Sequence, residues 1–174
     1  MANYQNKIAE TLSLWWNERS DIFKAEPSNN PELHVIKPTC QDGFVFCDVF
    51  AVAVFMTVDE WGFTHYLDGG VKSNPYTKVH KKITRDAYQA NKLPLLITRR
   101  GTRAPLIVIP RSAFNFFYDY HGRFESPNML FFVPEFKSPY NVVNFHEFLE
   151  WVSPDTVLNL DNNFENGKVI REKN

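Results

Sequence analysis

The change in apolar spacing between residues 73 and 120 restricts the fold of this chain more than any other feature. Ser73-Asn74-Pro75 places capping residues before a proline, which is typical of the first turn of a helix. The following residues are apolar at helical spacing: Tyr76, Val79, Ile83, Ala87 and Ala90. A second stripe at the same spacing is polar and mostly basic: Lys78, Lys82, Arg85 and Gln89. The pattern predicts a helix, ended by Asn91-Lys92, with one buried and one basic face.

Two strands and a second helix follow. Residues 93–98 and 105–109 are short apolar runs joined by an arginine-rich turn, and Pro110 begins a helix that reaches Tyr120. In the N-terminal half, residues 3–18 are apolar at helical spacing and predict an amphipathic helix. Three predicted strands follow that helix: 33–37, 44–56 (one long strand or two) and 63–72, which returns after a turn at 59–62. The predicted order is αβββαββα.

The signals in residues 121–174 are weaker. Residues 129–133 indicate a strand and residues 142–152 a helix, and we expect about the last ten residues to be loosely held. We interpret residues 1–120 as an α/β core and residues 121–174 as an extension packed on it. The extension contains an apolar run that is either a subunit interface or core: Met129, Leu130, Phe131, Phe132 and Phe136.

The composition is typical of an intracellular globular protein. With 174 residues and 44% apolar content, the chain can bury a core without disulfides. Cys40 and Cys47 are too few for a disulfide framework, and we interpret them as reduced thiols. No leader pattern opens the chain, and no apolar run approaches about 20 residues. We therefore expect a cytoplasmic protein of a bacterium or a phage-infected cell, with no membrane association.

The net charge of −1 conceals a strong asymmetry. Residues 1–71 carry 4 Lys/Arg and 10 Asp/Glu, a net of −6, and residues 112–174 carry 5 and 9, a net of −4. Residues 72–111 carry 10 Lys/Arg and 1 acid, a net of +9. Either the acidic flanks pack beside this basic segment and cancel its field, or the segment binds a polyanion.

Three residues on the predicted strands have the chemistry of a metal-dependent phosphodiester site. Side chains alternate along a strand, so Asp68 and Lys72 share one face of 63–72, and Asp48 lies on the preceding strand. Carboxylate oxygens are the ligands that Mg²⁺ prefers, and a lysine beside them stabilises charge on the phosphate. The alternative is that Asp68-Gly69-Gly70 forms only a bend or bulge and Lys72 is a solvated lysine on a strand edge.

The order of elements and several residues resemble the restriction-endonuclease-like (PD-(D/E)xK) nucleases, especially small phage and archaeal Holliday-junction resolvases. In that family a helix with a glutamate precedes a strand with an aspartate and a strand with (D/E)xK. A helix with a polar residue such as glutamine and a strand pair follow. The matching residues are Glu10 in NKIAETLSLWW, Asp48 in FCDVFAV, Lys72 in DGGVKS and Gln89 in DAYQANKLPLLITRR. The resemblance extends over residues 3–120.

The resemblance implies a mixed central sheet flanked by helices and an endonuclease that uses Mg²⁺ or Mn²⁺. It implies branched or duplex DNA as substrate and a homodimer as the active form. It implies catalytic roles for Glu10, Asp48, Asp68, Lys72 and Gln89, with the metal at Asp48 and Asp68. The sequence departs from the family at Gly70, which occupies the place of the acid in (D/E)xK. Either Asp68, about 7 Å along the same strand face, replaces that acid, or the site is inactive and the fold serves as a binding scaffold.

Basic residues predict a nucleic-acid-binding surface in either case. They lie along the predicted helix 73–91 and in the turn between the paired strands: Lys78, Lys81, Lys82, Arg85, Arg99, Arg100 and Arg103. Contacts of this kind bind phosphates, carry little sequence information and weaken with salt. The sequence therefore predicts a nucleic-acid-directed protein, an endonuclease or its inactivated descendant. The alternative is a phage-type interaction factor that binds a host protein.

The histidines are weaker candidates. His146 and Glu150 are four residues apart on a predicted helix, but the HExxH pattern lacks its second histidine, so a solvated helix face is expected. His65 and His80 lie near the predicted site, and for each the default is a packed or surface histidine rather than a phosphate contact.

Overall fold

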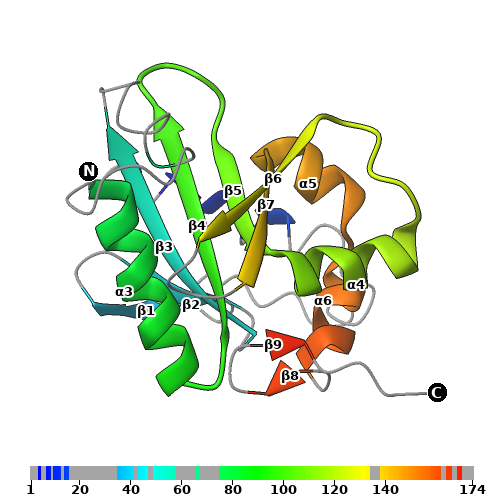
Figure 1. Cartoon of the computed structure of the whole chain (residues 1–174), viewed down its shortest axis with the longest axis horizontal. Coiled ribbons are helices and arrows are strands. Elements are labelled where there is room, and N and C mark those ends of the chain that lie inside the picture. The colour runs from blue at the N-terminus through cyan, green and yellow to red at the C-terminus, as the bar shows by residue number, and fades with distance from the viewer. Residues whose placement is uncertain are drawn as a thin grey trace.

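A computed structural model gives the arrangement of most of the chain (Figure 1). It describes residues 4, 7–8, 10–12, 14–15, 35–40, 43–46, 49–57, 66, 75–133, 138–161, 164–165 and 168–169. Of the described residues between 4 and 15, all are helical, as predicted. The later helices are α3 (Pro75–Gln89), α4 (Arg111–His121), α5 (Phe145–Trp151) and α6 (Pro154–Asp161).

Seven of the described strands form one mixed sheet, in the order β1-β2-β3-β4-β5-β7-β6. Their bounds are β1 (Val35–Cys40), β2 (Gly43–Phe46), β3 (Phe50–Thr57), β4 (Leu93–Arg100), β5 (Leu106–Pro110), β6 (Asn128–Val133) and β7 (Ser138–Asn144). β3 and β4 pair in parallel, and the other neighbouring pairs are antiparallel. A separate two-stranded sheet joins β8 (Phe164–Glu165) to β9 (Lys168–Val169).

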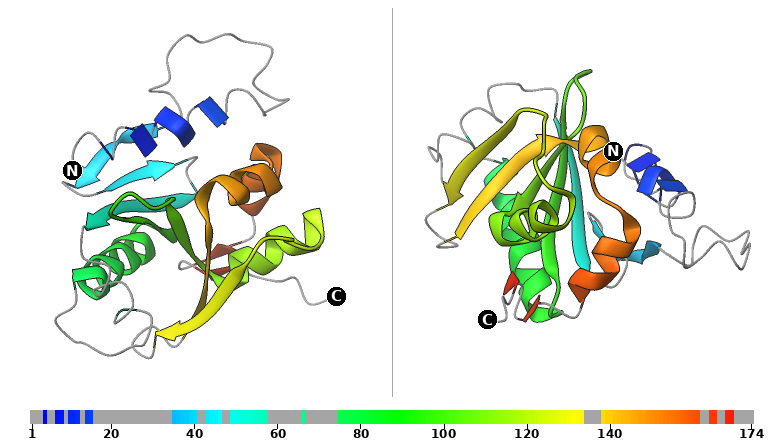
Figure 2. Two further views of the ribbon diagram at one scale, coloured as in Figure 1. Left: turned by 90° about the horizontal axis from the view of Figure 1, so that it is seen from above. Right: turned by 90° about the vertical axis from the view of Figure 1, so that its right-hand side faces the viewer.

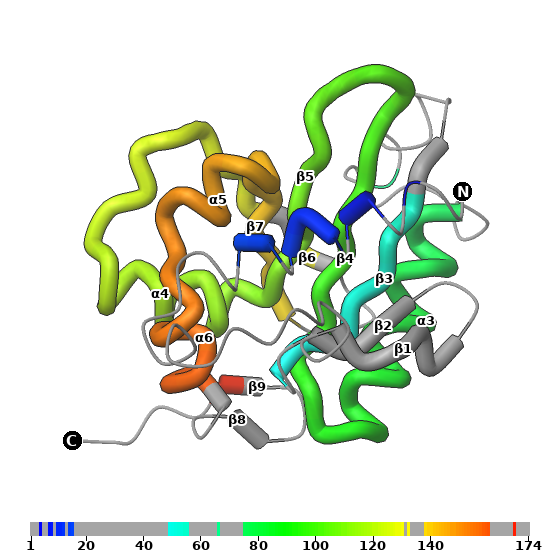
Figure 3. Tube along the Cα trace, turned by 180° about the vertical axis from the view of Figure 1, so that it is seen from behind, coloured from blue at the N-terminus to red at the C-terminus, as the bar shows by residue number. Residues whose placement is uncertain are grey.

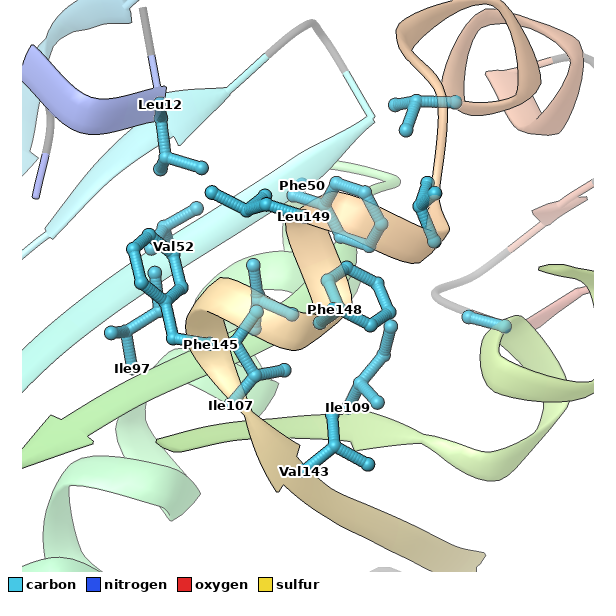
Figure 4. Packing of buried hydrophobic residues seen from close by; sticks show 14 of the residues in the cluster. Leu12, Phe50, Val52, Ile97, Ile107, Ile109, Val143, Phe145, Phe148 and Leu149 are labelled. Carbon is cyan, nitrogen blue, oxygen red and sulfur yellow. The ribbon is translucent and has the colours of Figure 1, made fainter. Parts of the chain in front are cut away.

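Helices cover both faces of the large sheet, which makes a three-layer α/β structure (Figures 1 and 2). One face packs against α4, α5, α6 and the N-terminal helical residues, through a core that contains the residues labelled in Figure 4: Leu12, Phe50, Val52, Ile97, Ile107, Ile109, Val143, Phe145, Phe148 and Leu149. The other face packs against α3. Because β3, β4 and β5 are buried from both sides, their sequences are apolar runs rather than alternating patterns.

The α/β class with a mixed sheet flanked by helices is confirmed, but the strands before α3 are not the predicted ones. Residues 44–56 form two strands, because β2 ends at Phe46 and β3 turns back antiparallel from Phe50. β3 then has β2 on one side and β4 on the other, and the strand predicted at 63–72 lies almost wholly outside the described residues. Tyr66, the described residue of 63–72, is helical.

Residues beyond 120 complete the sheet instead of packing on a finished core. The strand predicted at 129–133 is confirmed as β6, whereas the helix predicted at 142–152 is wrong in its first turn. β7 continues to Asn144 and pairs with β5, and α5 begins at Phe145. The Asn144 side chain caps α5 by accepting hydrogen bonds from the backbone N–H groups of His146 and Glu147.

The N-terminal helical residues are tied to α5 by a buried hydrogen bond. Trp15 Nε1 donates to the Leu149 carbonyl at 2.7 Å, in the last turn of α5, where carbonyls lack helical partners.

We expect Trp15→Phe to lower the free energy of unfolding by about 1 kcal/mol or more, because the donor is lost from a buried site. Urea unfolding measures the loss. Leu14→Ala is the matched control, since Leu14 is exposed in the same segment, and its effect should stay within about 0.5 kcal/mol. Equal losses in the two variants would contradict the assignment.

Candidate nucleic-acid interface

α3 separates a buried face from a basic face, as its sequence predicts. Its buried residues recur at helical spacing: Tyr76, His80, Ile83, Thr84 and Ala87. Lys78, Lys82, Arg85 and Gln89 are exposed on the opposite stripe, and Lys81 is half-buried. Lys78 and Arg85 make no ion pair with another residue that the structure describes. The positive charge of Lys78 and of Arg85 is therefore presented to solvent.

The end of α3 fixes how the basic stripe is oriented relative to β4. Asn91 has a left-handed backbone (φ 50°), and its N–H bonds to the Tyr88 carbonyl at 3.2 Å. The Lys92 N–H bonds to the Ala87 carbonyl at 2.8 Å, which completes a Schellman motif. The chain reverses there and enters β4 at Leu93. Since α3 and β4 thus run in opposite directions, the first turns of α3 lie toward the end of β4 that carries Arg100.

The turn between β4 and β5 stands out beyond the end of the sheet (Figures 1 and 3). Its arginines do not all face the same way. Side chains alternate along β4, so Arg100 shares a face with Leu96, which packs beneath α3. Arg99 points to the other face, where its guanidinium carbon lies 5.8 Å from the centre of the Tyr4 ring. Its Nε donates to the Arg103 carbonyl at 3.1 Å.

Arg99 therefore lies on the opposite side of the sheet from the basic stripe of α3. The expectation that Arg99, Arg100 and Arg103 share one surface with that stripe is wrong for Arg99. Tyr4 is buried beneath Arg99, and its hydroxyl has no hydrogen-bond partner among the described residues. Burial raises the pKa of Tyr4 to about 12, and the nearby Arg99 charge offsets only part of that rise. The remaining basic residues of α3 and the turn form what we call the basic surface: Lys78, Lys81, Lys82, Arg85, Arg100 and Arg103.

A buried polar cluster lies beneath α3, on the side away from the basic stripe. The Tyr66 hydroxyl is hydrogen bonded to His80 Nδ1 at 2.5 Å, and the Tyr140 ring meets the His80 ring edge-on with centroids 4.5 Å apart. The Tyr140 hydroxyl is hydrogen bonded to Tyr88. Burial raises the pKa of Tyr66 and of Tyr140 well above the usual value, so both stay neutral. The cluster joins α3 and β7 to the segment that contains Tyr66.

His80 is a packed histidine, in line with the default expectation for it. Burial lowers the pKa of His80 to about 3, so the ring is neutral near pH 7 and does not offer a positive charge to a phosphate. The helical spacing of apolar residues does not predict this buried polar cluster, because polar residues carry no signal in that pattern. The residues it leaves out are His80, Thr84, Tyr88 and Tyr140. The aromatic content of 16% was the only hint.

The catalytic residues that the family resemblance implies are not brought together within the described part of the chain. Asp48, Asp68 and Lys72 lie outside the described residues, as does His65. Glu10 is exposed on the N-terminal helical residues and Gln89 is exposed at the end of α3, and these two segments cover opposite faces of the sheet (Figure 2). Glu10 and Gln89 therefore do not face one site.

No metal-binding group of three or more carboxylate, histidine or cysteine side chains occurs among the residues whose positions the structure gives. His146 and Glu150 are both exposed on α5, as expected for a solvated helix face. None of the helices within the described ranges combines the length and apolar content that crossing a membrane requires. No protein family, curated protein or solved structure significantly matches this chain.

The neutral state of His80 gives the fold a defined sensitivity to acid. The ordinary histidine pKa is 6.5 and the folded value is about 3, so below pH 6.5 the unfolded chain binds a proton that the folded chain excludes. Stability is therefore fully present above pH 6.5 and falls as the pH is lowered, by up to about 1.4 kcal/mol per pH unit. Urea unfolding between pH 7.5 and 5.5 should give this slope in the wild-type protein.

His80→Asn should remove most of that slope, because the amide does not titrate and its oxygen can accept the Tyr66 hydroxyl. His146→Asn is the matched control, since His146 is exposed, and it should leave the slope unchanged. A slope that persists in His80→Asn would mean that other groups cause the loss of stability in acid.

Proposed function

We propose that the protein is nucleic-acid-directed and binds the phosphate backbone through the basic surface. The observation that supports this most is the exposed stripe on α3, opposite its buried face and directed toward the turn that carries Arg100 and Arg103. Between Pro75 and Arg103 the sequence contains eight Lys/Arg and one acid, Asp86, a net of +7. Six of the eight form the basic surface, on one face of α3 and in the turn, and this local excess of positive charge suits a polyanion.

The chemistry of the basic surface favours backbone contacts over base reading. Lysine and arginine at this density neutralise phosphates and release counterions, which makes binding steeply dependent on salt. Such contacts set the position of the nucleic acid without reading its sequence. DNA, branched or duplex, is the form that we propose as ligand.

We also propose that the chain has the restriction-endonuclease-like nuclease fold. The order αβββαββα with a mixed sheet supports this. The sequence weakens the catalytic part. In the family, the strand before the second helix carries (D/E)xK, and here Gly70 occupies the place of its acid. We therefore favour the inactivated descendant, a DNA-binding protein without catalysis.

A Mg²⁺- or Mn²⁺-dependent endonuclease is the second candidate. Its metal would be held by Asp48 and Asp68, whose oxygens are the ligands that such a cation prefers, and Lys72 would stabilise charge on the phosphate. The bound cation would supply Lewis-acid activation of the phosphodiester. What favours this candidate is sequence position alone: Asp48 falls between β2 and β3, at the end of one strand and the start of the next.

Charge reversal on the basic surface tests the binding proposal. Lys82→Glu combined with Arg85→Glu should weaken binding of a labelled four-way junction and of duplex DNA by at least about tenfold at low salt. The slope of log affinity against log salt should fall by about 2, because roughly two phosphate contacts are lost. Fluorescence anisotropy at several salt concentrations measures both.

The matched control is Arg111→Glu combined with Arg123→Glu, which changes the charge equally at exposed residues outside the basic surface. This control should bind with a nearly unchanged salt slope. Absence of binding by the wild-type protein at low salt would overturn the proposal and leave the protein-interaction factor. Equal weakening by both double variants would mean that net charge, not this surface, drives binding.

A cleavage assay on the same junction separates the two candidates. With Mg²⁺, Mn²⁺ or EDTA we expect binding and no cut product, because Gly70 replaces the acid of the family motif. Cleavage that requires the metal and is lost in both Asp48→Ala and Lys72→Ala would establish the endonuclease instead. Cleavage that survives both substitutions would point to a contaminating nuclease.

A further inference from the structure

The outer strand of the sheet, β6, has no described strand beyond it and carries exposed apolar side chains. In the strand order, β6 stands at one end and pairs with β7 alone among the described strands. Its sequence NMLFFV contains no charge and no proline. Met129, Leu130 and Phe132 are 41%, 47% and 55% exposed. Natural sheets normally protect such an edge with charges, proline or a covering element.

The exposed side chains of β6 lie on both faces of the sheet. Met129 is opposite Val142, which packs on the α3 face, whereas Leu130 is opposite Asn141 and Phe132 opposite Pro139 on the other face. A helix that covered β6 from one side would leave the other side exposed. A strand added to the edge would cover both, and its backbone would pair with the open N–H and C=O groups.

We propose that β6 pairs antiparallel with β6 of a second copy of this chain, which joins the two sheets into one. The sequence of β6 is compatible with pairing to a second copy of β6. It is uncharged, so self-pairing brings no like charges together, and apolar side chains meet apolar side chains on each face. A two-fold dimer requires a self-complementary patch of this kind.

The geometry of that dimer follows from the pairing. Two antiparallel strands in one continuous sheet are related by an axis perpendicular to the sheet, so the two copies of Leu130 and Phe132 lie on the same face. The same symmetry places both copies of α3 on one side of the joined sheet. If the proposed function holds, the two basic surfaces then face one nucleic acid together, but the dimer itself does not depend on that function.

The size of the patch sets the expected strength. Three large side chains that are about half exposed offer roughly 300 Å² per chain, or roughly 600 Å² in the pair, which is below the lower bound of about 1,200 Å² for specific, stable interfaces. The dimer should therefore be weak and its population should depend on concentration between roughly 1 and 500 µM.

Sedimentation velocity without DNA tests the proposal. The wild-type chain, 20.3 kDa as a monomer, should shift toward twice that mass as concentration rises. Leu130→Lys combined with Phe132→Lys places like charges across the axis and should weaken dimerisation at least about tenfold. Tyr118→Lys combined with Tyr120→Lys is the matched control on α4, with side chains 46% and 58% exposed, and it should dimerise like the wild type. Circular dichroism melts confirm that each variant is folded.

Hydrogen exchange adds a readout at the strand itself. Amides of residues 129–132 should gain protection as the concentration rises in the wild type, but not in the lysine variant of β6. A protein that stays monomeric throughout the range overturns the proposal and leaves a strand from another protein as occupant of the edge. Open-ended assembly, or dimerisation lost only in the α4 control, overturns it as well. DNA binding that fails while dimerisation persists bears on the proposed function alone.

Discussion

The parallel pairing of β3 with β4 under α3 is the constraint on which the rest of the structure depends. Parallel neighbours need a crossover, and here α3 lies within it and packs on the two strands that it connects. The register runs from Phe50 opposite Leu93 to Thr57 opposite Arg100. With helices on both faces, neither strand has a solvated side, so the middle of the sheet is apolar throughout. The same crossover determines which stripe of α3 is buried and which is basic.

The buried face of α3 is not purely apolar, and this is what makes the helix specific in its position. Ile83 and Ala87 pack in the apolar cluster, but His80 and Thr84 are buried on the same face, where the His80 ring meets the rings of Tyr66 and Tyr140. Desolvation keeps the histidine neutral and the tyrosine hydroxyls protonated, so the cluster gains hydrogen bonds without burying a charge. Hydrogen bonds demand a narrower geometry than apolar contacts do, which fixes α3 against β7 as well as against β3 and β4.

The sequence predicted the elements with strong local signals and missed those that depend on partners. α3, β4, β5 and α4 were predicted because proline starts, apolar periodicity and the Asn91 end agree with one another. Val142 and Val143 fit the helical period as well as the strand period, so the sequence predicts a helix where β7 ends, and only the cap at Asn144 separates strand from helix. The break between β2 and β3 was left open because both strands share one apolar, β-branched composition. For the candidate site, the exposed stripe of α3 follows from the helical spacing of its residues. The opposite directions of Arg99 and Arg100 do not, because the sequence analysis ends the strand at residue 98, whereas β4 continues to Arg100 and its side chains alternate between the two faces.

The fold restricts charged side chains to the ends of the central strands and to the outer face of α3. A carboxylate or lysine in the middle of β3 or β4 would be buried from both sides, and an unpaired buried charge is costly enough to exclude it. The parallel register brings the ends of β3 and β4 to one edge, at Thr57 and Arg100, and the start of α3 lies toward the same edge. In open α/β sheets, ligands bind outside the carboxyl ends of the strands. The basic surface occupies that edge and the helix beside it, so the position of the charge follows from the topology and not only from the residue count.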